Sequence, residues 1–413
     1  MNINEILTIT IVLTAVFAYV NHRFIKWPPT IGIMVLSLAC SLLLAAFGNS
    51  HSLLSGKAIQ LASSIDFEDV LMNFMLSFLL FAGAIQIDAG KLKKERWPVL
   101  ILSTLGILIS TTLVGSMTWG LFKLFHLSVP FIYCLLFGAL ISPTDPIAVL
   151  AILKAAKIPS SLELKISGES LFNDGVAVVV FVTLLDAAHS GVSAIDVVTV
   201  GKLFLQEAIG GLLFGAVLGY IGYYALRSID DYKVEVLVTL AIVVGGYFAA
   251  SRLHISGPLA MVVAGIITGN KVSDEVLSDT SRDYLEKFWE LVDEILNAIL
   301  FLLIGLEMLI IKINVTILII GAISIFTVLI ARWVAVFFPV LLLRYRLNFE
   351  KHAVAILTWG GLRGGLSVAL ALSLSPAMHR DEFVLITYMI VVFSILVQGL
   401  TIGPLARRLQ GIN

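Results

Sequence analysis

The sequence has few charged residues. Only 13% of its 413 residues are Asp, Glu, Lys or Arg, whereas a soluble domain usually carries about 25%. Hydrophobic residues make up 59% of the chain and the mean hydropathy is +1.01. Long apolar runs recur from end to end, so we expect one membrane domain over residues 1–413 and no soluble domain. The net charge of −1 gives no basic field, so we expect no nucleic-acid partner.

Several motifs that would indicate other functions are also missing. The two cysteines, Cys40 and Cys134, lie inside apolar runs and predict neither a disulfide framework nor a metal site. No His-Glu-x-x-His and no nucleotide-binding motif occurs, which disfavours a membrane enzyme or a pump. We therefore expect no cofactor. The N-terminus lacks the basic segment of a signal peptide, so the first apolar run is predicted to be a retained helix.

The apolar runs predict an all-α polytopic membrane protein. A spanning helix needs about 20 mostly apolar residues. A polar stretch at 271–288 is predicted to be an interfacial amphipathic helix. The pattern indicates thirteen spans, at about 5–22, 30–47, 68–88, 97–124, 129–153, 161–187, 201–227, 232–251, 256–270, 289–311, 314–343, 350–375 and 382–406.

The loop cations predict the orientation. With thirteen spans, nineteen Lys and Arg residues fall on the face that follows the first span, and six fall on the opposite face. Cytoplasmic loops carry the excess of Lys and Arg. The chain is therefore predicted to lie in the inner or plasma membrane, with its N-terminus outside and its C-terminus in the cytoplasm.

Two arginines, Arg332 and Arg363, fall inside predicted spans and away from their ends. A charge at the bilayer centre costs at least about 2.5–3.5 kcal/mol, so it needs a partner or a wet cavity. Snorkelling to the interface would require a position near a span end. The two arginines are therefore the first indication of a functional site.

Two spans contain helix-breaking motifs. Span five holds Ile-Ser-Pro-Thr-Asp-Pro at 141–146, in which Pro143 and Pro146 flank Asp145. Proline removes a main-chain donor and clashes with the preceding turn. Span twelve holds Thr-Trp-Gly-Gly-Leu-Arg-Gly-Gly-Leu-Ser at 358–367, whose four glycines weaken the helix. Paired interruptions are typical of inverted-repeat transporters, with spans one to six mirroring eight to thirteen. A simple kink and close glycine packing are the alternatives.

Span six carries a polar face at membrane depth. In Ser-Gly-Glu-Ser-Leu-Phe-Asn-Asp-Gly, 167–175, Glu169 lies four residues before Asn173, and Ser170 lies four before Asp174. These four side chains share one broad helix face. Oxygen ligands suit a hard cation, and intramembrane acids indicate ion pathways or proton relays. One acid can pair with an arginine while another binds a cation or a proton. A structural polar seam and a channel pore remain alternatives.

Three motifs together resemble a known family. Pro143-Thr-Asp-Pro146, Gly168-Glu-Ser-Leu-Phe-Asn-Asp-Gly175 and Gly360-Gly-Leu-Arg-Gly-Gly365 are similar to signatures of the NhaP-type sodium/proton antiporters. These belong to cation:proton antiporter family one, with the animal Na⁺/H⁺ exchangers. The resemblance implies thirteen helices, a homodimer in lipid, and exchange of one Na⁺ or Li⁺ for one H⁺ in pH and sodium homeostasis. It implies a secondary transporter and no enzyme. K⁺/H⁺ exchange remains the alternative.

The resemblance also implies residue roles at the ion site. Asp174 corresponds to the carboxylate that binds the ion or the proton. Asn173 stands where electrogenic relatives carry a second aspartate, which implies electroneutral exchange. Ser170 and Asp145 correspond to further ion-site residues, and Thr144 contributes its main-chain carbonyl. The implied Na⁺ ligands are thus Asp174, Ser170, Thr144 and Asp145.

The remaining charged residues correspond to structural positions of the family. Glu169 resembles the acid that pairs with the arginine of span eleven, which here is Arg332. Arg363 matches the arginine of the second broken helix. The resemblance therefore implies a buried Glu169–Arg332 ion pair and an Arg363 charge at the second break.

Overall fold

The helices account for nearly all of the described chain. The computed structural model describes residues 3–47, 60–61, 70–145, 149–150, 152–153, 159–189, 197–272, 278–311, 314–343, 349–350 and 352–410. Within these ranges no β-strand occurs apart from a single bridge. The main helices are α1 (Ile3–Val20), α2 (Pro29–Phe47), α5 (Leu76–Ile85), α6 (Ala89–Leu124), α7 (Phe131–Ile141), α9 (Ser160–His189), α10 (Val197–Leu226), α11 (Tyr232–Arg252), α12 (Gly257–Ile267), α14 (Asp279–Glu307), α15 (Val315–Leu343), α16 (Ala353–Trp359), α17 (Gly365–Leu372), α18 (Arg380–Phe393) and α19 (Gly399–Gln410).

The all-α prediction with two interrupted spans is confirmed. In the described part of the chain, seven helical segments are long and apolar enough to cross a membrane. Shorter apolar helices accompany them, such as α7 and the segment that contains α12. Predicted span five is represented by α7, which stops at Ile141. Predicted span twelve is divided into α16 and α17. The two interruptions account for two of the predicted spans that are not continuous long helices in the described part of the chain.

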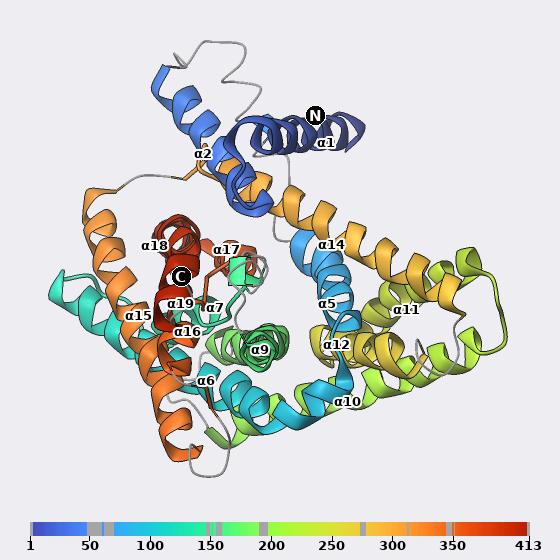
Figure 1. The fold of residues 1–413 in the computed structure, drawn as a ribbon. Coiled ribbons are helices and arrows are strands. Elements are labelled where there is room, and N and C mark those ends of the chain that lie inside the picture. The colour runs from blue at the N-terminus through green and yellow to red at the C-terminus, as the bar shows by residue number, and fades with distance from the viewer. Residues whose placement is uncertain are drawn as a thin grey trace.

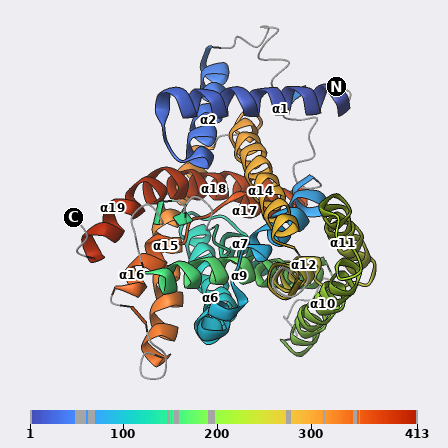
Figure 2. The same cartoon turned by 45° about the vertical axis from the view of Figure 1, so that its right-hand side comes forward.

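The helices form two packed groups (Figure 1). A cavity lined by residues of both groups lies between them. One group contains α6, α7 and α9 with α15 to α19, and the other contains α5, α10, α11, α12 and α14. In Figure 2, α1 lies across α2 and the end of α14, and contacts between these three helices agree with that view. Because α9 touches α5 and α12 as well as α6 and α7, it brings its polar middle to the boundary between the groups.

Small residues allow α6 and α7 to pack backbone against backbone. A Cβ atom on Gly138 of α7 would lie 2.2 Å from the main-chain oxygen of Thr111 on α6, and one on Gly115 would lie 2.9 Å from Cα of Leu135. Such contacts between small residues are a main source of helix association in membranes. They hold the end of α7, where the first break begins, firmly against a long membrane helix.

Helix α14 differs from the sequence prediction. Instead of an interfacial helix at 271–288 followed by a span at 289–311, one helix runs from Asp279 to Glu307. Ser278 caps its start by accepting a hydrogen bond from the main-chain nitrogen of Ser281 at 3.3 Å. No proline or glycine interrupts the polar half, and ion pairs four residues apart support its exposed face, such as Arg282–Glu286 at 3.0 Å. The polar stretch therefore continues directly into the membrane helix, and residues 273–277 lie outside the described part.

Candidate ion site

The first break places Asp145 beside the second break. Helix α7 ends at Ile141, and Ser142 follows as its C-cap residue. Beyond Pro143 the chain is extended, and the main-chain nitrogen of Asp145 donates a 2.8 Å hydrogen bond to the oxygen of Leu362. Pro146, the second proline of the motif, lies outside the described residues. The two non-helical segments therefore cross and share a main-chain hydrogen bond.

Glycines in the second break make room for this crossing. A Cβ atom on Gly364 would lie 2.5 Å from Oδ2 and 2.7 Å from Cβ of Asp145. A Cβ atom on Gly361 would lie 2.7 Å from Nε of Arg332 and 3.1 Å from the side chain of Thr144. The glycine-rich sequence thus allows a carboxylate and a guanidinium to approach the main chain closely.

The polar face of α9 holds the first break in place. Asn173 donates from Nδ2 to Oγ1 of Thr144 at 2.7 Å, and the Thr144 main-chain nitrogen donates to Oδ1 of Asn173 at 3.3 Å. Ser170 donates from Oγ to the main-chain oxygen of Thr144. All three residues are buried. Ser170 and Asn173 therefore act here as partners of Thr144.

Arg332 and Glu169 form a buried ion pair that links α15 to α9. Nη1 of Arg332 contacts Oε1 of Glu169, and Nη2 donates to Oε2 at 3.1 Å. The exposed fractions are 6% for Arg332 and 2% for Glu169. Nη2 also donates to the main-chain oxygen of Leu357 on α16 at 3.1 Å. This forked geometry is the strong form of an arginine–carboxylate pair. The ion pair that the family resemblance implied therefore lies in the protein core.

Arg363 satisfies main-chain carbonyls at the end of α7. Its Nη1 donates to the oxygens of Ser142 and Pro143, the latter at 2.9 Å, while its main-chain nitrogen donates to Oγ of Ser394, also at 2.9 Å. The last carbonyls of a helix lack intrahelical partners and carry partial negative charge. Arg363 is 2% exposed. It belongs to the second break and caps the free carbonyls at the first break.

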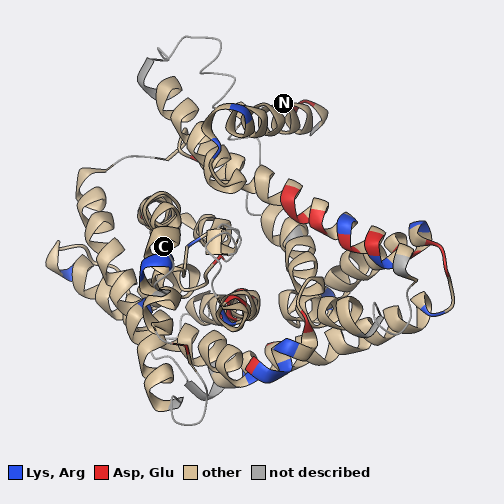
Figure 3. Ribbon diagram, viewed as in Figure 1, with Lys and Arg blue, Asp and Glu red and all other residues tan. Residues whose placement is uncertain are grey.

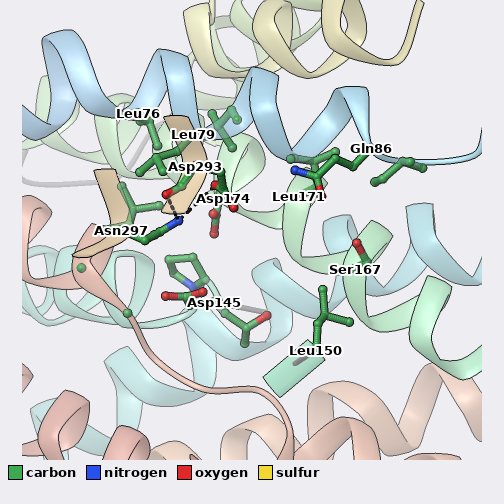
Figure 4. A pocket seen from close by; sticks show the side chains of 18 of the residues that line it. Leu76, Leu79, Gln86, Asp145, Leu150, Ser167, Leu171, Asp174, Asp293 and Asn297 are labelled. Carbon is green, nitrogen blue, oxygen red and sulfur yellow. Dashed lines mark hydrogen bonds between the residues drawn. The ribbon is translucent and has the colours of Figure 1, made fainter. Parts of the chain in front are cut away.

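A cavity of about 540 Å³ opens between the two helix groups. Figure 4 shows Asp174 and Asp145 facing it. Of the predicted ion-site residues, Asp174, Asp145 and Thr144 line the cavity, whereas Ser170 and Asn173 are absent from the lining that the structure describes. The structure thus brings the whole predicted set together but divides it into two layers, one on the cavity and one supporting it.

The mouth of the cavity lies where α6 and α9 begin. Asp88, the N-cap of α6, lies there together with Lys91 and Glu163. The main-chain and side-chain hydrogen bonds from Lys91 hold the pKa of the Asp88 carboxyl below its ordinary value. This carboxylate is therefore ionised at neutral pH, and it contributes negative charge at the entrance.

Two residues of the cavity wall were missed by the sequence analysis. Asp293 and Asn297 on α14 line the same cavity as Asp174 (Figure 4). Their spacing of four residues puts them on one helix face, which was the available signal. Both residues fall inside the predicted span 289–311, and only the packing of α14 against the other helices places them at this cavity.

Comparison with known proteins identifies the family. The family model "Sodium/hydrogen exchanger, transmembrane" matches residues 11–408. The chain belongs to the sodium/hydrogen exchanger family. It is 49% identical over 408 residues to the Na⁺/H⁺ antiporter NhaP of Pseudomonas aeruginosa, covering 97% of this chain and 95% of that one. It is 36% identical over 357 residues to the Na⁺/H⁺ antiporter NhaH of Halobacillus dabanensis, covering 83% and 84% of the two chains.

A solved structure shares the fold of this exchanger. The sodium proton antiporter MjNhaP1 from Methanocaldococcus jannaschii at pH 8 matches with a TM-score of 0.76 at 18% identity, and the match covers 98% of both chains. The similarity extends over nearly the whole chain. The arrangement of interrupted helices described above therefore belongs to a fold that a sodium proton antiporter also adopts.

Proposed function

We propose that this protein is a secondary antiporter that exchanges Na⁺ or Li⁺ for H⁺. The observation that carries the proposal is the location of Asp174 and Asp145 on a cavity between membrane helices. Both buried arginines are engaged elsewhere, Arg332 by Glu169 and Arg363 by main-chain carbonyls. The carboxylates at the cavity therefore supply negative charge to an ion that enters. Family membership and the named antiporters among the relatives support the same function.

Competition for one carboxylate explains the exchange. An alkali cation prefers oxygen ligands, and the proposed Na⁺ ligands are Asp174, Asp145, Ser170 and the main-chain carbonyl of Thr144. A proton on Asp174 removes the charge that the cation needs, so only one of them occupies the site at a time. The Thr144 oxygen that accepts from Ser170 has a second lone pair for the ion. Neither a cofactor nor an enzymatic step is needed.

The neutral side chain of Asn173 predicts exchange of one cation for one proton. Asn173 takes up no proton and is bonded to Thr144. We propose that Asp145 stays ionised through the cycle, so that Asp174 alone changes its occupant; if Asp145 also took up a proton, two protons could move per cation. Such a cycle moves no net charge. A potassium-diffusion potential imposed on proteoliposomes without Na⁺ or pH gradients should drive no sustained flux. A flux that reverses with the sign of the potential would show that the cycle moves charge.

The loop cations support a cytoplasmic position for the cavity mouth. Asp88, Lys91 and Glu163 at the mouth belong to the face that carries the excess of Lys and Arg, which marks the cytoplasmic face. We therefore place the protein in the cell membrane with the N-terminus outside and the C-terminus inside. On this proposed orientation, the ion site would open to the cytoplasm. A homodimer in lipid, and a role in sodium and pH homeostasis, complete the proposal.

Transport by purified protein in proteoliposomes tests the function. With an imposed pH gradient, Na⁺ or Li⁺ added outside should dissipate the gradient, and Asp174→Asn should abolish the response because an amide neither takes up the proton nor neutralises the cation. K⁺ is the matched comparison that decides between Na⁺/H⁺ and K⁺/H⁺ exchange. Normal exchange by a well-folded Asp174→Asn protein would reject the proposed role of Asp174.

A further inference from the structure

Helix α14 presents an acidic face to the cavity. Glu290, Asp293, Glu294 and Asn297 line it, and Figure 3 shows the row of acidic residues along this helix. Asp293 and Asn297 lie deepest along this row. Asp174 lines the same cavity (Figure 4). Three elements thus contribute to the cavity wall: α9, the first break and α14.

Asn297 lies in this wall, and its side-chain oxygen Oδ1 accepts no hydrogen bond from the described residues. Its Nδ2 donates to the main-chain oxygen of Asp293 at 2.8 Å and to Oδ1 of the same residue at 3.0 Å. The residue is 2% exposed, and its own Oδ1 has no hydrogen-bond partner within the described part of the chain. Both amide donors therefore point back at Asp293, which directs the amide oxygen elsewhere. A buried carbonyl oxygen without a partner is unfavourable unless a donor or a cation meets it.

A second oxygen of the same kind comes from the second break. Ser367 of α17 lines the cavity, is 1% exposed, and its Oγ finds no hydrogen-bond partner among the described residues. Helix α17 packs on α14 at this level, since a Cβ atom on Gly365 would lie 2.6 Å from a methyl carbon of Leu300, one turn beyond Asn297. Asp293, Asn297 and Ser367 thus all belong to the wall of the same cavity, and the amide oxygen and the hydroxyl are buried within that wall.

We infer that Asp293, Asn297 and Ser367 form an outer cation site in the cavity, which binds the alkali cation before it reaches Asp174. The inference rests on the proposed exchange function and extends it. Carboxylate, amide and hydroxyl oxygens are the ligands that hard monovalent cations prefer. Among the described residues, seven carboxylates line the cavity against one basic side chain, Lys91, which pairs with Asp88 at 3.1 Å at the mouth. The negative electrostatic potential of the cavity therefore attracts cations towards this site.

Sodium uptake kinetics test the outer site. Proteoliposomes with an imposed pH gradient take up radioactive Na⁺ over a range of concentrations. Asp293→Asn should raise KM for Na⁺ about tenfold with little change in the maximal rate. Asn297→Ala, which removes an oxygen without changing charge, should also raise KM and should alter the ratio of the KM values for Li⁺ and Na⁺. Asn297→Asp adds a negative charge at the same position and should lower KM, which is the opposite of the effect expected for Asn297→Ala.

Glu286→Gln is the matched control. It removes one negative charge from the exposed part of the same helix, where Glu286 pairs with Arg282 and does not line the described cavity. Its KM should equal that of the unmodified protein. If Asp293→Asn raises KM but Asn297→Ala does not, general attraction explains the data and the outer site is overturned. Unchanged KM in both variants overturns it as well.

The same assay separates this inference from the proposed function. If Asp174→Asn is inactive while Asp293→Asn and Asn297→Ala keep the original KM, the outer site fails and the exchange mechanism stands. If Asp174→Asn exchanges normally, the proposed function itself fails. Melting temperatures in detergent confirm that each variant is folded before its kinetics are compared.

Discussion

The two helix breaks interrupt their spans with different residues. The first break uses proline and carries an acid, Asp145, whereas the second uses glycine and carries a base, Arg363. Proline has no main-chain donor, so the end of α7 presents carbonyls, and Arg363 binds two of them. Glycine leaves space beside the main chain, and Asp145 fills it. Each break therefore supplies a contact that the other needs. Glycines in the first motif or prolines in the second would not provide the same contacts.

The ion pair that anchors the second break should have the largest effect on stability. Arg332 holds Glu169 on α9 and Leu357 on α16. Glu169→Ala or Arg332→Ala leaves an unpaired charge at low dielectric, which costs about 3–5 kcal/mol. Melting temperatures in detergent should fall for both single variants, and the double variant should recover part of the loss. Strictly additive losses would contradict the pairing.

Filling the space beside the second break should have an intermediate effect. In Gly364→Ala the new Cβ would lie 2.5 Å from Oδ2 of Asp145, so the crossing must shift, at about 1–3 kcal/mol. We expect lower stability and a loss of exchange. Gly120→Ala in α6 is the control, because nothing lies within 4 Å of its added Cβ. Equal behaviour of the two variants would show that the breaks do not depend on this close approach.

The smallest effect is expected where the second break is tied to the helix behind it. Ser394→Ala removes the acceptor of the Arg363 main-chain nitrogen at 2.9 Å and should cost about 1 kcal/mol. Ser373→Ala is the comparison, since that hydroxyl donates within its own helix, to Leu370. A thermal denaturation series should rank Ser394→Ala below Ser373→Ala in stability. The reverse order would argue that the second break holds its shape without this bond.

Much of the site could be predicted because its residues break local rules. Prolines beside Asp145, four glycines around Arg363 and two acids within an apolar run are visible in the sequence, and they indicated broken helices and intramembrane charge. The Glu169–Arg332 pairing came from the family resemblance, since the two residues are 163 positions apart. No local pattern determines which of several acids an arginine meets.

The parts that escaped prediction depend on packing between distant segments. The sequence does not show that Asn173 and Ser170 both bond to Thr144, because these contacts join α9 to the first break. Asp293 lies 119 positions after Asp174 in the sequence, and only the packing of α14 against the other helices places it at the same cavity. The many charged residues of 271–288 suggested an interfacial helix. The sequence pattern does not reveal whether such a polar segment ends at the membrane surface or continues into the next helix, as it does in α14.

Proton release on sodium binding tests the central claim most directly. The claim is that a cation and a proton compete for the Asp174 carboxylate. Adding saturating Na⁺ to purified protein in weakly buffered detergent solution, at a pH where the site is partly protonated, should release protons, up to one per chain. Choline chloride at the same ionic strength controls for salt effects. Asp174→Asn should release none, because a side-chain amide has no proton that titrates near this pH. Undiminished release by folded Asp174→Asn would contradict the account.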